Sequence, residues 1–340
     1  MASREMKCLI WDLDNTLWKG VLLEGDTVEL RPGVREVIET LDRRGILQSI
    51  ASRNDRDTAM EALRKFGLEE FFLYPQINWG PKSASVAAIA NQLNLDSKAL
   101  AFIDDQRYER DEVAAVLPNV LFIDAEELPA MLGRPEFNPR FITEDARRRR
   151  SMYQAEIDRR KVEQAMPSPE FLESLSMVFT ISAAGKHDLR RLKELTVRTN
   201  QLNSTGHTYS LAELGRFRQS PDHLLLIAGL EDSYGTYGKV GMALVECHPD
   251  SWDLKLLLMS CRVMSRGVGM ILLTHILQLA AAEQKALRAD FVRTSRNRMM
   301  YLTFKLAGFR ETGRDGDLAR LEHDLDSIDP HPGHVKVVLA

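Results

Sequence analysis

The chain has 340 residues, 44% of them hydrophobic, and its 45 Lys and Arg against 49 Asp and Glu give a net charge of −4. This composition is typical of a soluble globular protein. Because the charge is nearly neutral and evenly mixed, it excludes a protein whose affinity comes mainly from neutralising the phosphates of nucleic acid.

Cysteine content and hydropathy restrict the compartment. Three cysteines, Cys8, Cys247 and Cys261, are too few and too scattered for a disulfide framework or a zinc finger, which favours a reducing cytoplasm. The first residues do not resemble a signal peptide, and no apolar run reaches the roughly 18 to 20 residues that span a bilayer. We therefore expect a cytoplasmic protein that binds neither nucleic acid nor membrane. At typical domain sizes of about 100 to 200 residues, the length predicts two domains.

The first predicted domain covers residues 1–135 and alternates short apolar runs with amphipathic stretches. The runs expected to form strands are 7–11, 47–52, 99–104 and 119–124. The stretches expected to form helices are 34–45, 57–67 and 83–94. This repeated strand–helix alternation predicts an α/β fold with a parallel sheet and helices on its faces.

Residues 136–168 are polar and predict a linker with a charged helix. We expect this helix to begin near Thr143, with acidic residues in its first turn, and to stop before Pro167. The four arginines at 147–150 could form a docking patch for an acidic partner. A solvated helix face is the preferred interpretation.

The second predicted domain covers residues 169–340 and has longer apolar runs. Strands are expected at 177–182, 223–231, 240–248, 252–261 and 289–294, and helices at 187–199, 266–286 and 297–306. Adjacent long strands ahead of a glycine-containing turn and a long helix predict a mixed α+β domain.

The most specific motif follows the first predicted strand. Asp12 and Asp14 come directly after a buried apolar run, so the strand places two carboxylates at its carboxyl end, where α/β sheets bind ligands. One aspartate can attack phosphorus, while a neighbouring carboxyl protonates the leaving oxygen and later activates water. A simple turn is the alternative, because Asp and Asn are common turn residues.

Further polar residues follow the next strands and complete a phosphate-handling set. Ser52 can hold a phosphate oxygen, and Lys82 supplies an ammonium before a helix. Asp104 and Asp105 end another strand and are suitable ligands for a hard cation, for which Mg²⁺ is the natural choice.

In order and spacing, these residues resemble the four motifs of the haloacid dehalogenase (HAD) superfamily. The resemblance implies that Asp12 is the nucleophile and a Mg²⁺ ligand, and that Asp14 is the general acid/base and offers its backbone carbonyl to the metal. It also implies that Ser52 and Lys82 bind the phosphoryl group, and that Asp104, supported by Asp105, completes the metal site. Only 39 residues separate Asp12 from Ser52, which leaves no room for a large cap and favours a bulky or protein-bound substrate.

A closer resemblance covers nearly the whole chain. The stretches DLDNTLWKGVL (12–22), INWGPKS (77–83), RTNQLNSTG (198–206) and LLMSCRVMSRGVG (257–269) are similar to FkbH-like proteins. The resemblance implies a HAD phosphatase joined to a domain of acetyltransferase-like (GNAT) fold. It also implies that the glyceryl group of 1,3-bisphosphoglycerate is loaded on an acyl carrier protein thiol, on its phosphopantetheine arm, and dephosphorylated for polyketide biosynthesis. Met264 interrupts the glycine-rich pyrophosphate cradle of acetyltransferases, so acetyl-CoA binding is not implied.

Candidate acyl-handling residues lie in the second domain. Cys261 ends a predicted strand beside Arg262, a setting that could lower a thiol pKa, and the resemblance favours it as the acyl-accepting nucleophile over a small buried hydrophobe. The remaining candidate substrate-binding residues are Thr199, Asn200, Gln201, Asn203, Arg262 and Arg266. For the residues at 199–203, capping of a helix end is an equal alternative.

The sequence thus predicts a glyceryltransferase/phosphatase that uses Mg²⁺, with an acyl carrier protein and 1,3-bisphosphoglycerate as partners. Two alternatives stay open. One is a Mg²⁺-dependent phosphatase that acts on another phosphorylated substrate. The other is a non-catalytic module that docks carrier proteins, against which the intact acidic motif argues.

Overall fold

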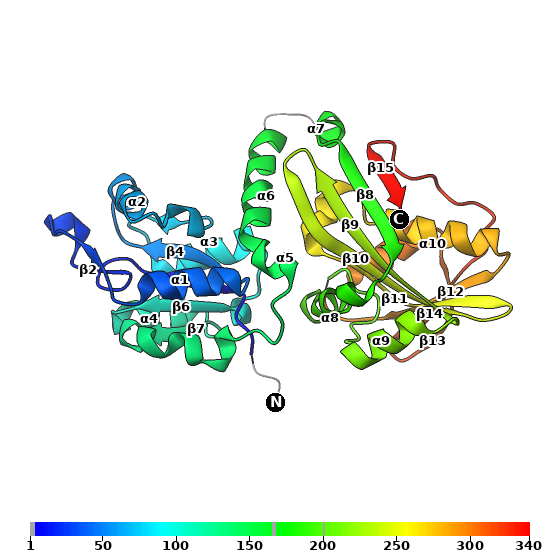
Figure 1. Ribbon diagram of the computed structural model, residues 1–340, viewed down its shortest axis with the longest axis horizontal. Coiled ribbons are helices and arrows are strands. Elements are labelled where there is room, and N and C mark those ends of the chain that lie inside the picture. The colour runs from blue at the N-terminus through cyan, green and yellow to red at the C-terminus, as the bar shows by residue number, and fades with distance from the viewer. Residues whose placement is uncertain (1–3, 165–167, 200) are drawn as a thin grey trace. The chain divides into compact units, whose positions relative to one another are not determined.

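The protein forms two compact units, Met1–Gln154 and Ala155–Ala340, in a computed structural model (Figure 1). The structure describes residues 4–164, 168–199 and 201–340, apart from the side chains of Ser168, Cys261 and Ser265. The boundary between the units falls inside the predicted linker. Within the described residues, no helix has both the length and the apolar character needed to cross a lipid bilayer.

The first unit is built on a five-stranded sheet with the order β5-β4-β1-β6-β7. Every neighbouring pair in this sheet is parallel. Its strands are β1 (Cys8–Trp11), β4 (Leu47–Ser52), β5 (Gln76–Ile77), β6 (Leu100–Asp104) and β7 (Leu121–Asp124). Parallel sheets are buried on both faces, which explains why β1, β4 and β6 are continuous apolar runs whose residues are all buried.

Helices cover both faces of this sheet. They are α1 (Val34–Arg43), α2 (Arg56–Lys65), α3 (Lys82–Leu93) and α4 (Arg107–Val116), and 3₁₀ turns lie at Leu22–Glu24, Glu69–Phe71, Ser97–Ala99, Ala125–Gly133 and Pro135–Phe137. Helices α1 and α2 share one hydrophobic core with β1, β4 and β6, whereas α3 and α4 contact each other. The predicted parallel α/β fold is therefore confirmed.

A small two-stranded flap follows β1. It consists of β2 (Trp18–Lys19) and β3 (Glu29–Leu30), which pair antiparallel. With α1, this flap fills the chain between Asp12 and Ser52, so this interval holds no large cap.

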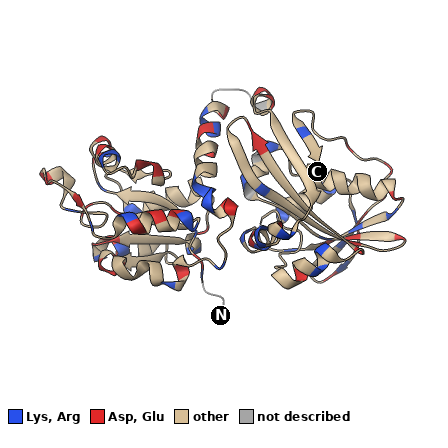
Figure 2. Cartoon of the chain, viewed as in Figure 1, with Lys and Arg blue, Asp and Glu red and all other residues tan. Residues whose placement is uncertain are grey.

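The start of the charged segment, residues 143–150, packs on the first unit through Thr143, Arg149 and Arg150. Thr143 caps α5 (Glu144–Arg147) through its hydroxyl, as expected at the predicted helix start, but the helix breaks at Arg148 before α6 (Arg149–Glu163). Charged residues of both signs lie along α6 (Figure 2).

The solvated-face interpretation of the four arginines is wrong for two of them. Arg149 is 7% exposed and donates to the Gly45 carbonyl at 2.5 Å. Arg150 donates to Asp42 and to Glu70, each at 3.0 Å. Both guanidinium groups therefore have partners within the protein, whereas the sequence pattern favoured exposure to solvent.

The second unit contains an eight-stranded mixed sheet with the order β13-β14-β12-β11-β10-β9-β8-β15. Its strands are β8 (Met177–Ala183), β9 (His223–Asp232), β10 (Gly235–Cys247), β11 (Ser251–Met259), β12 (Ala286–Val292), β13 (Arg310–Asp315), β14 (Leu318–His323) and β15 (Val335–Leu339). Strands β11 and β12 are parallel, as are β8 and β15, and the other neighbours are antiparallel.

Side chains alternate between two cores on the faces of this sheet. One core includes α7 (Ser168–Ser174), α10 (Ile271–Ala282) and α11 (Arg298–Leu306). The other includes α8 (Leu189–Arg198) and α9 (Leu211–Gln219), and the remaining 3₁₀ turns are Lys186–Asp188 and Cys261–Arg266. This arrangement confirms the predicted mixed α+β fold of the second domain.

Two fully buried arginines hold the end of α6 in the second unit. Arg159 pairs with Asp232 at 2.6 and 2.8 Å, and its guanidinium lies 3.9 Å from the Tyr237 ring centroid. Arg266 pairs with Glu156 at 3.0 Å and with Glu163 at 3.3 Å. The C-terminal half of the predicted linker helix is thus part of the second unit's packing.

Two glycines provide a test of how α5 packs. Gly45 and Gly67 follow the ends of α1 and α2 with φ of +71° and +65°. A Cβ at Gly45 would lie 2.5 Å from the Ala146 carbonyl oxygen, whereas Gly67 has nothing within 4 Å. We expect Gly67→Ala to lower the free energy of unfolding by about 1–2 kcal/mol through backbone strain alone. Gly45→Ala should cost about 1–3 kcal/mol more.

Urea unfolding of the full chain, followed by circular dichroism, measures this difference. Equal losses in the two variants would contradict the packing of α5 against the turn after α1.

Candidate active site

The four predicted motifs meet at the carboxyl edge of the first sheet. Because β4, β1 and β6 are neighbours, Asp12 after β1 lies between Ser52 at the end of β4 and Asp104 at the end of β6. Lys82 begins α3 and reaches the same place. All four side chains are buried, and Asp104 has no exposed surface.

Lys82 joins the two central carboxylates. Its Nζ donates to Asp12 Oδ1 at 2.8 Å and to Asp104 Oδ2 at 2.6 Å. Burial raises the pKa of Asp104 to about 7, and the neighbouring charge of Asp12 adds to the effect. Burial opposes the charged form of Lys82, but Asp12 and Asp104 together raise its pKa, so the ammonium persists.

A divalent cation would balance the negative charge that remains on the carboxylates. Oxygen atoms of Asp12, Asp104 and Asp105 lie within 4.8 Å of one another. Three carboxylates beside one ammonium leave an excess of negative charge in a buried place. Burial raises the pKa of Asp105, and the charge of Asp12 raises it further. This all-oxygen donor set suits Mg²⁺, which is commonly held by carboxylates, substrate phosphate and water. The predicted contribution of the Asp14 carbonyl to the metal stays a prediction.

Asp14 is held apart from this cluster by three donors. Its Oδ1 accepts from Trp18 Nε1 at 2.7 Å and from the Leu22 amide at 3.2 Å, and its Oδ2 accepts from Asn54 Nδ2 at 3.0 Å. Burial raises the pKa of Asp14, the hydrogen bonds from Trp18 and Leu22 oppose the shift, and the charge of Asp12 adds to it. A carboxyl fixed in one orientation next to the buried Asp12 can give and take a proton at the group that Asp12 attacks.

Sequence reasoning missed three residues that shape the site. The Thr16 hydroxyl lies 3.3 Å from both Asp12 Oδ2 and Asp105 Oδ1, and it accepts from the Asp105 amide at 3.0 Å. Trp18 and Asn54 hold Asp14, as described above. Two of them could have been found from their positions next to predicted site residues. Thr16 ends the DLDNT run, and Asn54 stands two residues after Ser52.

The candidate residues of the second unit have mixed outcomes. Asn200 and the side chain of Cys261 lie outside the described residues, so the acyl-accepting role of Cys261 stays a prediction. Asn203 donates to the Thr199 carbonyl at 3.2 Å and accepts from the Gly206 amide at 2.8 Å, which favours the capping alternative. Thr199 is buried and Gln201 half-buried.

Of the two candidate phosphate-binding arginines, Arg266 has a structural role here. Its guanidinium is fully buried and paired with Glu156 and Glu163, which leaves no exposed surface for a ligand. Arg262 is half-buried, and its Nε donates to the Ser260 hydroxyl at 3.4 Å.

Comparison with protein families supports the hydrolase resemblance of the first unit. Residues 18–109 match the family of haloacid dehalogenase-like hydrolases, so the first unit carries a hydrolase domain of this type. The matched range includes Ser52, Lys82 and Asp104, and it begins after Asp12 and Asp14. No curated protein matches the chain.

Solved structures resemble each part of the chain separately. The N-terminal part of BF1531 from Bacteroides fragilis, which contains a phosphatase domain and is complexed with Mg, is 27% identical with a TM-score of 0.35. It covers 38% of this chain, which in turn spans 40% of that structure. The ribosomal-protein-S18-alanine N-acetyltransferase from Escherichia coli is 14% identical, covering 45% of this chain and 98% of its own, with a TM-score of 0.35. The PaiA N-acetyltransferase from Thermoplasma acidophilum, in complex with coenzyme A, is 17% identical, with coverages of 43% and 98% and a TM-score of 0.34.

Removing the bridging ammonium should destabilise the first unit. Lys82→Met leaves Asp12 and Asp104 buried without their partner, and we expect a loss of about 3–5 kcal/mol in the free energy of unfolding. Lys65→Met is the matched control, because Lys65 is exposed and pairs with Glu61 on the surface of α2, where little change is expected. Chemical unfolding of both variants without added metal measures the difference, and equal stabilities would refute the central position of Lys82.

Magnesium affinity should depend on pH through Asp104. Since the pKa of this carboxyl is raised to about 7, Mg²⁺ must displace a proton below that pH and none above it. The affinity should therefore rise by up to about tenfold per pH unit from pH 5.5 to 7 and then level off. Calorimetric titration with Mg²⁺ at several pH values tests this, and a flat profile over that range would contradict the assignment of Asp104 as a ligand.

Proposed function

We propose that the chain is a Mg²⁺-dependent phosphotransfer enzyme that also transfers an acyl group. The observation that carries the phosphatase part is the buried Asp12 carboxylate, held by Lys82 next to Asp104, with Asp14 fixed beside it. The family match of residues 18–109 to hydrolases agrees with this chemistry.

The phosphatase reaction follows from the roles of these side chains. A carboxylate oxygen of Asp12 attacks phosphorus, the bond from phosphorus to the ester oxygen breaks, and Asp14 protonates the departing alcohol. Asp14 then takes a proton from water, which attacks the aspartyl phosphate and frees Asp12. Ser52 and Lys82 bind the phosphoryl oxygens. When bound, Mg²⁺ neutralises the charge that develops on them.

The acyl substrate is inferred from the FkbH-like resemblance. The Cys261 thiolate attacks the acyl carbon of 1,3-bisphosphoglycerate, so that a C–S bond forms, the C–O bond breaks and inorganic phosphate leaves. A carrier-protein thiol then attacks the thioester and regenerates Cys261. The first unit removes the remaining phosphate ester, before or after this transfer, and the final product is glyceryl-acyl carrier protein for polyketide biosynthesis. With this chemistry, the protein would work in the cytoplasm.

Intact-protein mass spectrometry tests both activities together. The full chain is incubated with 1,3-bisphosphoglycerate and Mg²⁺, and covalent adducts and released phosphate are measured. We expect a glyceryl adduct that is lost in Cys261→Ala and kept in Cys247→Ala, a matched control in the same unit. In Asp12→Asn, the adduct should keep its phosphate.

The outcomes separate the three functions. Phosphate release without an acyl adduct would favour a phosphatase for another substrate. Neither adduct nor phosphate release would favour a non-catalytic module that docks carrier proteins.

A further inference from the structure

A second group of potential metal ligands lies on the hairpin of β10 and β11, outside the site described above. Glu246 and Asp253 are directly opposite each other in the antiparallel register of the two strands. His248 stands two residues after Glu246, and its amide bonds to the Ser251 carbonyl across the turn. Because side chains alternate along strands, all three are expected on one face of the sheet. Cys247 and Trp252, between them in sequence, pack against the core on the other face.

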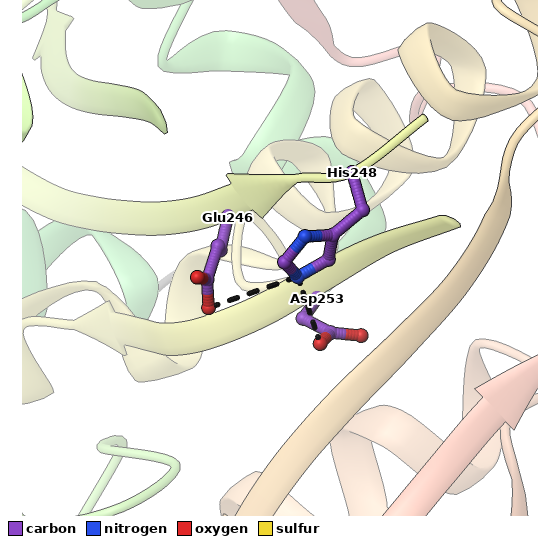
Figure 3. Close-up of side chains that lie close together, drawn as sticks. All are labelled: Glu246, His248 and Asp253. Carbon is purple, nitrogen blue, oxygen red and sulfur yellow. Dashed lines mark ion pairs between the residues drawn. The ribbon is translucent and has the colours of Figure 1, made fainter. Parts of the chain in front are cut away.

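The three side chains converge on one point. His248 Nε2 lies 3.5 Å from Asp253 Oδ2 and 3.9 Å from Glu246 Oε2, so the imidazole edge sits between the two carboxylates (Figure 3). The three ligand atoms lie within 4.8 Å of one another. For ligands about 2.1 Å from a tetrahedral zinc ion, neighbouring ligand atoms are about 3.4 Å apart. The observed separations are close to that value, and small side-chain rotations would bring all three atoms within reach of one ion.

We propose that Glu246, His248 and Asp253 form a second divalent-cation site, which takes a transition metal of the zinc class. One neutral imidazole and two carboxylates neutralise a divalent ion and leave a coordination position for water or another ligand. The imidazole nitrogen sets this site apart from the all-oxygen cluster of the first unit, because imidazole suits Zn²⁺ and its neighbours in the transition series, whereas carboxylates suit Mg²⁺.

One carboxylate oxygen of the cluster lacks a partner in the described part of the chain, although 29% of the Asp253 side chain is exposed. Asp253 Oδ1 is buried and has no hydrogen-bond partner among the described residues. A buried carboxylate oxygen without a partner is costly, and a cation held by both oxygens of Asp253 would give Oδ1 a partner.

The ammonium of Lys255 interacts with the charges of Asp253 and Glu246, but its hydrogen bond goes to another carboxylate. Lys255 Nζ donates to Asp290 at 2.8 Å, so its ammonium is bound by a carboxylate outside the cluster. Lys255 is also the residue left unmatched where the register of β10 and β11 shifts, since Leu244 pairs with Leu256 and Val245 with Leu254. Such a bulge locally twists a hairpin and redirects its side chains.

Zinc binding to the full-length protein tests the proposal. Protein stripped of metal is titrated with Zn²⁺ in the presence of excess Mg²⁺, which occupies the site of the first unit, and bound zinc is measured by competition with a chromophoric chelator. We expect His248→Ala to bind zinc at least about tenfold more weakly than the unchanged chain, since even loss of a residue that only supports a ligand typically costs 10- to 100-fold. Glu246→Gln keeps the size of the side chain and should weaken binding in the same direction.

The matched control is His187→Ala. His187 is an exposed histidine of the same unit that faces one carboxylate, Asp188, at 3.4 Å. This variant should bind zinc like the unchanged chain. Cobalt gives a second readout, because Co²⁺ at an imidazole–carboxylate site should give visible absorption that His248→Ala removes.

Two results would overturn the proposal. One is equal zinc affinity in the unchanged chain and in a folded His248→Ala variant, and the other is a cobalt spectrum that the substitution leaves unchanged. In either case the three residues would form only an ion-paired hairpin. Neither readout depends on phosphatase or acyl-transfer activity, so failure here would leave the proposed function standing.

Discussion

The ammonium of Lys82 is the interaction on which the candidate active site depends. Parallel strands deliver Asp12 and Asp104 to one edge of the sheet, where both lose most of their hydration, and like charges in such a place repel strongly. Lys82 lies between them and bonds to both. Because Lys82 begins α3, a single helix start determines where the compensating charge stands. The same atom that stabilises the carboxylate pair would, on the proposed function, also meet the transferred phosphoryl group.

In the second unit, buried arginines compensate the charge of neighbouring carboxylates. Arg159 and Arg266 are fully buried and together meet Asp232, Glu156 and Glu163. A planar guanidinium offers several donors in a fixed geometry, so one side chain can satisfy two acceptors where a lysine would act as a point charge. These arginines therefore hold the end of α6 in the second unit, and their charges are already paired with carboxylates.

The sequence predicted the strands whose burial is complete and did not predict several partly exposed elements, namely α4, α9, β13, β14 and β15. Strands such as β1, β4 and β6 were predictable because both of their faces are buried, which makes them continuous apolar runs. Most of the candidate motif was predictable because Asp12, Ser52 and Asp104 stand at the ends of those strands in chain order. By contrast, β2, β3 and β5 are two residues long and show no period. Thr16, Trp18 and Asn54 act by hydrogen bonds, and Arg149 is buried against Gly45, 104 residues away. Local pattern does not encode such pairings.

The two acidic clusters show how nearby charge decides what a carboxylate can bind. In the first unit, Lys82 neutralises part of the cluster, so the remaining oxygen atoms suit one hard cation that also meets a phosphate. On the β10–β11 hairpin the ammonium of Lys255 is bound to Asp290, and the imidazole of His248 stands between the two carboxylates. In the site proposed there, the nitrogen donor shifts the preference from magnesium to zinc. On this proposal, an imidazole in the place of a lysine separates the two metal preferences within one chain.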